Sequence, residues 1–257
     1  MEGLSVFDFN FLDEINISSL KEELFEDGSY NILPYKQLEH YPNTYFQKVG
    51  VDLAIYQFPT LELINFLKEW VIEGETIEIA SGRGIIGKAL GIPCTDSRIQ
   101  EDEDYKKIIL KQMQRPVTYG DHVEKLDCIE AIKKYKPKVV IASWYTGLYD
   151  MHLKPLNGYG TNEEEFIDDI ETYILIGNES VHRTKFLMTK QHREYKAPWL
   201  ISKAEDRKLN RIYIWTKKPI MVSAKKFNFK MQLKKSNPDK VQKLSQPFRA
   251  VVLNPEL

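Results

Sequence analysis

The chain has 257 residues, of which 42% are hydrophobic and 28% charged, and its formal net charge is −1. This composition is ordinary for a globular protein, and a chain of this length buries about 70–75% of its unfolded surface without needing disulfides or metals. Two cysteines, Cys94 and Cys128, exclude a disulfide framework and suit a reducing compartment. No basic leader opens the chain and no apolar run approaches membrane-spanning length, so we expect a cytoplasmic protein.

Charge is unevenly distributed along the chain. Residues 217–249 hold ten Lys or Arg against one acid, which gives this segment a net charge of +9. Such asymmetry is typical either of an anion-binding tail or of a solvated, lysine-rich extension.

The first 58 residues are aromatic-rich and interrupted by prolines, and we expect them to form a helical cap. Residues 18–25 are predicted to be a short helix, with Ser19 as its N-cap and Glu22 in the reciprocal capping position. A second helix is expected over 59–71, where apolar residues recur on one face.

Strands and helices alternate through the following 160 residues. Strands are predicted at 76–80, 92–95, 117–119, 138–144 and 172–177, and helices at 85–91, 104–114, 126–135 and 162–169. Residues 198–202 and 211–216 are expected to pair as an antiparallel hairpin. The pattern predicts an α/β fold: a Rossmann-like, doubly wound sheet with helices on both faces, over residues 59–218. Residues 219–257 are then a basic C-terminal extension.

The most specific motif is the turn after the strand at 76–80. Gly82, Gly84 and Gly87 spell G-x-G-x-x-G, and a predicted helix begins at once. Glycines allow a tight turn and the close approach of a ligand to the backbone, and the free N–H groups of a helix start suit an anion. The alternative is a strand-to-helix turn that binds no ligand.

At this motif the chain resembles the class I S-adenosylmethionine-dependent methyltransferases over residues 59–218. Glu78, Ala80, Gly82 and Gly84 occupy the acid and glycine positions of the family's first motif, with Ala80 in place of the first glycine. The resemblance implies a seven-stranded sheet whose last strand is inserted antiparallel. It also implies S-adenosylmethionine as cofactor and a role for Glu78 in orienting the turn or the cofactor's amino-acid end. We include Ser81 and Ser143 in the expected cofactor site.

Two further acids match positions that follow strands in this family. The resemblance implies that Asp96 accepts hydrogen bonds from the ribose and that Asp121 bonds the adenine amino group. Both positions also suit a turn or helix cap. Glu101 and Asp102 keep a nicotinamide cofactor open as an alternative, because their distance from Gly82 fits a dinucleotide site.

The end of the fourth strand carries Ser143, Trp144 and Tyr145. It lacks both the Asp/Asn-Pro-Pro-Tyr signature of amino-methylating nucleic-acid enzymes and the Pro-Cys nucleophile of cytosine C5 enzymes. Trp144 and Tyr145 are expected either to line the methyl-transfer pocket or to pack in the core. Tyr56 and Glu179 join them on the expected substrate side, and His152 and His182 are further candidates for a general base. No catalytic residue is assigned.

The five histidines and two cysteines show no metal-ligand spacing, so no metal is expected. Residues 158–179 resemble bacterial and phage members of the family whose activity is unknown. We expect a methyltransferase acting on a small molecule or protein, with no membrane partner. Three alternatives stay open: a nucleic-acid methyltransferase using the basic tail, a non-catalytic cofactor-binding module, and an NAD-dependent oxidoreductase.

Overall fold

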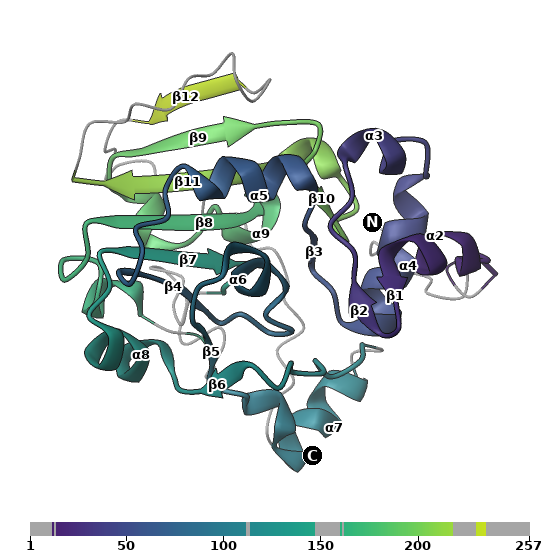
Figure 1. Cartoon of the computed structure of the whole chain (residues 1–257), viewed down its shortest axis with the longest axis horizontal. Helices are drawn as coiled ribbons and strands as arrows, with labels where there is room; N and C mark the ends of the chain where they lie inside the picture. The colour runs from purple at the N-terminus through teal and green to yellow at the C-terminus, as the bar shows by residue number, and fades with distance from the viewer. Residues whose placement is uncertain are drawn as a thin grey trace, which may run out of the picture.

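Eight strands of the described residues form one mixed sheet. The computed structural model describes residues 12, 14–111, 114–146, 160, 162–217 and 230–234. The strand order across the sheet is β12-β9-β11-β8-β7-β4-β5-β6 (Figure 1). The bounds are β4 Thr76–Ile79, β5 Cys94–Asp96, β6 Val123–Lys125, β7 Val139–Ser143, β8 Thr172–Asn178, β9 His192–Lys196, β11 Asn210–Thr216 and β12 Lys230–Lys234.

Five neighbouring strands, β6-β5-β4-β7-β8, run parallel, whereas β11 lies antiparallel between β8 and β9. The chain therefore forms the predicted Rossmann-like α/β sheet closed by a C-terminal antiparallel hairpin. The order reverses at β4, because β5 follows on one side and β7 on the other. In doubly wound sheets ligands bind at such a switch point, beyond the carboxyl ends of the strands.

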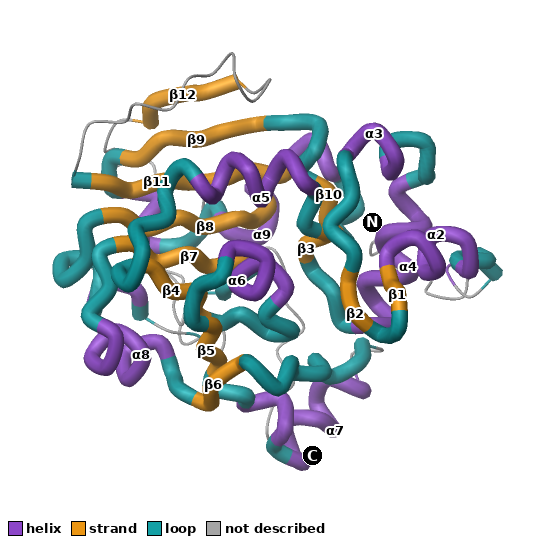
Figure 2. The backbone as a smooth tube through the Cα atoms, viewed as in Figure 1, coloured by secondary structure: helices purple, strands orange, loops and turns teal. Residues whose placement is uncertain are grey.

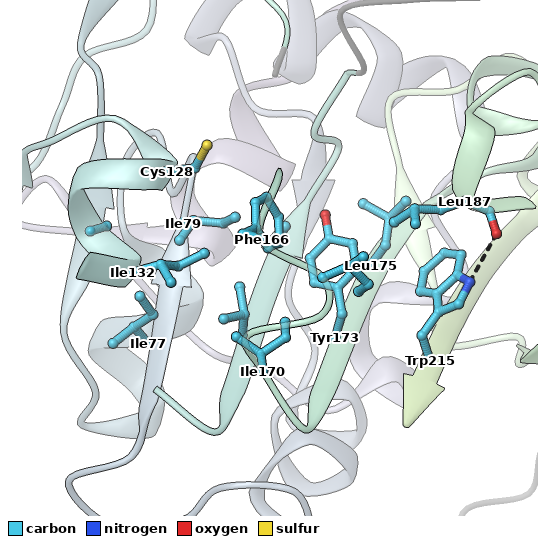
Figure 3. Close-up of a cluster of buried hydrophobic side chains, with 14 of the residues drawn as sticks. Ile77, Ile79, Cys128, Ile132, Phe166, Ile170, Tyr173, Leu175, Leu187 and Trp215 are labelled. Atoms are coloured by element: carbon cyan, nitrogen blue, oxygen red, sulfur yellow. Dashed lines mark hydrogen bonds between the residues drawn. The ribbon is translucent and has the colours of Figure 1, made fainter. Parts of the chain in front are cut away.

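Side chains of the central strands alternate between two apolar layers, as the period of two in a strand requires. On one face, Ile77, Val140 and Tyr173 pack under helix α8 (Cys128–Tyr135) and the segment that contains Phe166 and Ile170. Figure 3 shows this layer, where the Trp215 indole N–H donates to the Leu187 carbonyl at 2.9 Å. Helix α8 begins with a capping box between Asp127 and Glu130.

The opposite face is covered by helices α5 (Leu61–Lys68) and α6 (Ile85–Leu90). Leu63, Phe66 and Ile86 pack there against Ile141 and Ile174 of the strands. Thr60 caps α5 by accepting a hydrogen bond from the Leu63 amide. Helices on both faces bury the central strands, which explains the apolar runs of β7 and β8.

The N-terminal segment has its own apolar cluster and lies beyond the carboxyl ends of the parallel strands (Figures 1 and 2). It contains helices α2 (Ser18–Leu24), α3 (Tyr35–Leu38) and α4 (Asn43–Leu53), and the two-stranded β1 (Phe25–Glu26) and β2 (Ser29–Tyr30). Strand β3 (Gln57–Phe58) pairs antiparallel with β10 (Ile201–Ser202) and so joins this segment to the C-terminal half of the core.

Two sequence-based expectations about strands were wrong. The hairpin partner of β11 is β9 and not residues 198–202, of which Ile201 and Ser202 pair with β3 instead. The third parallel strand is β6 and not 117–119, where the Val117 amide bonds the Gln100 side chain. The sheet also gains an eighth strand, β12, inside the predicted basic extension.

Two helix predictions also needed correction. Ile17 occupies the N-cap position of α2, and the Ser18 amide donates to Asn16 Oδ1 at 3.0 Å, so Ser19 lies inside the helix and does not cap it. The helix expected over 162–169 is a single 3-10 turn, Glu163–Glu165, capped by Asn162.

Most of the basic segment 217–249 lies outside the described residues. Within the described ranges, no helix has the length and apolar character needed to cross a membrane. The same ranges hold no group of three or more His, Cys, Asp or Glu arranged to hold a metal ion.

Candidate functional site

A cavity of about 390 Å³ opens at the switch point of the sheet, between the carboxyl ends of β4, β5 and β7 and the N-terminal segment. Its volume lies within the 300–1,000 Å³ typical of small-molecule sites. Among its lining residues are Ala80, Ser81, Gly82, Asp96 and Ser143. Three strands, the turn after β4 and the N-terminal segment therefore converge on one space.

The turn after β4 has three residues in the left-handed region: Ala80 at φ 48°, Gly82 at 54° and Gly84 at 69°. The Gly84 amide closes the turn by donating to the Ser81 carbonyl at 2.8 Å. Ala80 stands where the resembling family has glycine, and it adopts the positive φ nonetheless. A side chain in this region costs about 1–2 kcal/mol because its Cβ approaches the following carbonyl oxygen.

Ala80→Gly should therefore stabilise the fold by up to about 1 kcal/mol, since relief of strain outweighs the added entropy of the unfolded chain. Urea unfolding measures the change. The matched control is Ala89→Gly inside helix α6, which should destabilise by about 0.5–1 kcal/mol. Equal destabilisation by both substitutions would show that Ala80 is not strained.

Asp96 ends β5 and holds the glycine turn in place. One carboxylate oxygen accepts from the Gly82 amide at 2.9 Å and the other from the Arg98 amide at 2.8 Å. The Tyr119 hydroxyl is a further hydrogen-bond partner. Burial raises the pKa of Asp96, whereas these hydrogen bonds oppose the rise. A carboxylate has about four acceptor positions, so Asp96 retains capacity for a ligand hydroxyl.

Glu78 lies in the middle of the sheet, 1% exposed, at the base of the cavity. Its Oε2 accepts from the Gly87 amide at 2.9 Å and so ties the strand to the first turn of α6. Burial raises the pKa of Glu78 to about 8, and the nearby Asp96 carboxylate adds to the rise. Glu78 is therefore mostly protonated at neutral pH.

Glu78→Gln should remove a pH dependence of stability. The pKa of Glu78 is raised on folding, so between about pH 4.5 and pH 8 the unfolded chain loses a proton that the folded chain keeps. The wild type accordingly loses stability as pH rises, by up to about 2–3 kcal/mol between pH 5 and pH 7, and glutamine does not.

Urea unfolding at a series of pH values measures this effect. Glu124→Gln is the control, because this carboxyl lies at the surface beside Lys134 and its pKa is lowered. Its curve should run parallel to that of the wild type across this range. A parallel curve for Glu78→Gln as well would exclude a raised pKa at Glu78.

The end of β7 forms a second wall of the cavity. Trp144 has φ 56°, an unusual conformation for a bulky residue, and its indole N–H donates to Gln57 Oε1 at 3.3 Å. The Ser143 hydroxyl is buried with no hydrogen-bond partner among the described residues. The Tyr145 carbonyl accepts from the buried Lys185 ammonium at 2.8 Å. Strained and unsatisfied groups of this kind concentrate at binding sites.

Tyr56 from the N-terminal segment faces this wall. Its ring centroid lies 5.9 Å from that of Trp144, and the Lys203 ammonium lies 3.6 Å from the Tyr56 ring centroid on the protein side. Burial raises the pKa of Tyr56 to about 12 and lowers that of Lys203 to about 8. Tyr56 is therefore a neutral, fixed aromatic surface of the cavity.

The structure brings together most, but not all, of the residues singled out from the sequence. Those that line the cavity are Glu78, Ala80, Ser81, Gly82, Asp96, Ser143, Tyr56, Trp144 and Tyr145. Gly84 lies behind the turn against His122. Asp121 is exposed and precedes β6, and Glu179 forms an ion pair with Arg211 at 2.6 Å; neither lines the cavity.

The two histidine candidates differ in position. His182 is fully buried beside Trp144, and burial lowers its pKa to about 3. It does not line the cavity. His152 lies outside the described residues. The acids that suited a nicotinamide cofactor are also elsewhere: Glu101 pairs with Arg98, and Asp102 caps helix α7 (Glu103–Lys111).

Sequence reasoning missed a group of lining residues contributed by the segment between β5 and β6 and by the turn itself: Arg83, Gln100, Tyr105, Ile109, Gln114 and Tyr119. Most of them come from a connection whose path no local pattern predicts. Arg83 is different, because a charged residue between the two glycines of a strand-to-helix turn is a visible signal in the sequence.

Comparison with protein-family models finds no match, and comparison with curated proteins finds none either. Among solved structures, the chain is similar to a mutant of DNMT2 from Spodoptera frugiperda, with 12% identity and a TM-score of 0.27. That likeness covers 55% of this chain and about half (49%) of the DNMT2 chain. It is also similar to an uncharacterized protein from Listeria monocytogenes serotype 4b, with 14% identity over 64% and 72% of the two chains and a TM-score of 0.30.

Proposed function

We propose that the protein is an S-adenosylmethionine-dependent methyltransferase of a small-molecule or protein substrate. The observation that carries this proposal is the pairing of the glycine turn with Asp96 at the switch point of the sheet. The Gly82 amide and the Asp96 carboxylate bond each other at 2.9 Å on the wall of one cavity. In this arrangement one small molecule can contact both the backbone of the glycine turn and the Asp96 carboxylate.

The cavity's chemistry fits an adenosine carrying an amino acid. Asp96 has about one free acceptor position for a ribose hydroxyl, and Ile99, Ile109 and Val117 offer apolar surface for a flat base. Ser143 supplies a buried hydroxyl that has no partner within the described ranges. Tyr56 and Trp144 are aromatic neighbours suited to a sulfonium cation.

When bound, S-adenosylmethionine supplies an activated methyl group on a sulfonium, so the protein mainly has to orient the acceptor and exclude water. Tyr56, Trp144 and Tyr145 are the side chains that we assign to this role. Trp144 is held by its hydrogen bond to Gln57, and Tyr145 by that of its carbonyl to Lys185. The Lys185 ammonium also lies 5.2 Å from the Tyr145 ring centroid, so both aromatic side chains have contacts that favour one position before a ligand arrives.

Calorimetric titration with S-adenosylmethionine and S-adenosylhomocysteine tests the proposal, with NAD as the competing ligand. We expect both sulfur ligands to bind and Asp96→Asn to weaken them by roughly 10–100-fold, because a charged acceptor is lost. The matched control is Asp121→Asn, an exposed carboxylate outside the cavity, which should leave affinity unchanged. Binding of NAD alone, or of none of the three, would overturn the proposal.

A further inference from the structure

Arg83 stands between the two glycines of the turn and is one of the residues that line the cavity. One guanidinium nitrogen, Nη1, donates to the Leu53 carbonyl at 3.0 Å, the last residue of helix α4. A guanidinium has five N–H donors, so four of them are not used by this bond.

Among the described residues that line the cavity, Arg83 is the one cation, and Glu78 and Asp96 are the two acids. Neither acid pairs with Arg83 in the part of the chain that the structure describes. Glu78 accepts from the Gly87 amide, and Asp96 accepts from the Gly82 and Arg98 amides. Arg83 is half-buried, and burial lowers the pKa of its guanidinium. A cation that is partly removed from water and lacks a counter-ion is costly unless a ligand supplies one.

The charges of the proposed cofactor complement this arrangement. S-adenosylmethionine carries two cationic groups, a sulfonium and an ammonium, and a single anionic group, its carboxylate. The planar fork of an arginine matches a carboxylate and forms two parallel hydrogen bonds with it. Asp96 would repel the same carboxylate and the mostly protonated Glu78 would not attract it, so Arg83 is the lining side chain suited to it.

We propose that Arg83 binds the carboxylate of the cofactor's amino-acid end, an inference that rests on the proposed function. The turn then does two things: its backbone meets Asp96, and its central side chain selects ligands that carry an amino acid. The bond to Leu53 orients the guanidinium, because it fixes one nitrogen and directs the remaining donors.

The competing role for Arg83 is structural, since the same bond to Leu53 ties the turn to the N-terminal segment. Two ligands separate these roles. S-adenosylhomocysteine contains the adenosine, the sulfur and the amino acid, whereas 5′-methylthioadenosine contains the adenosine and sulfur without the amino acid. A carboxylate contact affects the first ligand alone, whereas a damaged cavity affects both.

The experiment is calorimetric titration of the full chain and of Arg83→Gln and Arg83→Lys with both ligands. We expect Arg83→Gln to weaken S-adenosylhomocysteine by roughly 10–100-fold and to leave 5′-methylthioadenosine unchanged. Arg83→Lys keeps the charge without the fork, so its loss for S-adenosylhomocysteine should be smaller. Arg98→Gln is the control: Arg98 pairs with Glu101 and does not line the cavity, so the ratio of the two affinities should stay that of the wild type.

Equal affinity of Arg83→Gln and the wild type for S-adenosylhomocysteine would overturn the inference. So would an equal loss for both ligands, because the cavity and not the carboxylate contact would then be damaged. If the wild type itself binds neither ligand, the proposed function fails, an outcome distinct from binding that is insensitive to Arg83.

Discussion

Lys185→Met should destabilise the fold by about 3–5 kcal/mol, because it leaves a buried carboxylate without its counter-ion. The Lys185 ammonium lies 2.9 Å from Glu163 Oε1, and both side chains are about 5% exposed or less. The Tyr173 hydroxyl donates to the same carboxylate oxygen at 2.8 Å. A second consequence reaches the cavity, because Lys185 also donates to the Tyr145 carbonyl at its wall.

Urea unfolding measures the loss, and a double variant tests its cause. Adding Glu163→Gln to Lys185→Met removes the stranded charge, while an amide oxygen can still accept from Tyr173. The double variant should therefore recover at least about 2 kcal/mol of the loss. Lys107→Met serves as the control, since its ion pair with Asp104 is exposed and should contribute nothing measurable. A double variant no more stable than Lys185→Met alone would locate the cost elsewhere.

The parallel half of the sheet was predictable from the sequence because its strands are buried on both faces. Strands β7 and β8 consist mainly of Val, Ile and other apolar residues and are buried along almost their whole length. Such uniform burial is typical of a central parallel strand, and a helix of this length would not require it. The turn after β4 was predictable for the same local reason: a buried strand, two glycines and a helix follow one another within ten residues.

The edge of the sheet was not predictable because its strands are polar. Strand β9 has the sequence HREYK, in which no apolar alternation is visible. It nevertheless pairs with β11 along one edge and with β12 along the other. Residues 198–202 have a more apolar, strand-like sequence than β9. Ile201 and Ser202 do form a strand, but it pairs with β3, and Ile201 is buried in the N-terminal cluster. In both segments the pairing partner determined which sheet the strand joined. Partners that are far apart in sequence leave no local pattern from which to predict the pairing.

The candidate site likewise contains residues that the sequence located correctly, whereas one expected residue lies elsewhere. Glu78, Gly82 and Asp96 stand at fixed offsets from strand ends, so the motif located them. Asp121 was expected at the end of the third strand, but that strand begins two residues later, at Val123, and Asp121 therefore lies at its opposite end. A shift of six residues in one short strand was enough to move an acid from the expected adenine side to the surface.

The packing behind the turn leads to the second large effect. Gly84→Ala should destabilise the fold by about 2–4 kcal/mol, and Gly91→Ala by about 1 kcal/mol. The two glycines flank helix α6 with nearly equal dihedrals, φ 69° and ψ 24° against φ 69° and ψ 31°. A Cβ at Gly84 would lie 2.7 Å from Val123 Cγ2 and 2.4 Å from His122 Nε2, whereas one at Gly91 would meet nothing within 4 Å.

Since both substitutions carry the same backbone strain, the difference between them measures the cost of packing alone. Val123 is buried in β6 and pairs with Cys94 of β5, so it cannot move away without disturbing the strand that ends in Asp96. His122 is exposed, but its Nε2 bonds the Gly84 carbonyl at 3.0 Å, so moving the ring away from a new Cβ also breaks this bond, and that loss is part of the packing cost. Urea unfolding of both variants gives this difference directly. Equal losses would mean that the strand yields to the new methyl group, and that the close approach of the turn to β6 does not hold Asp96 in place.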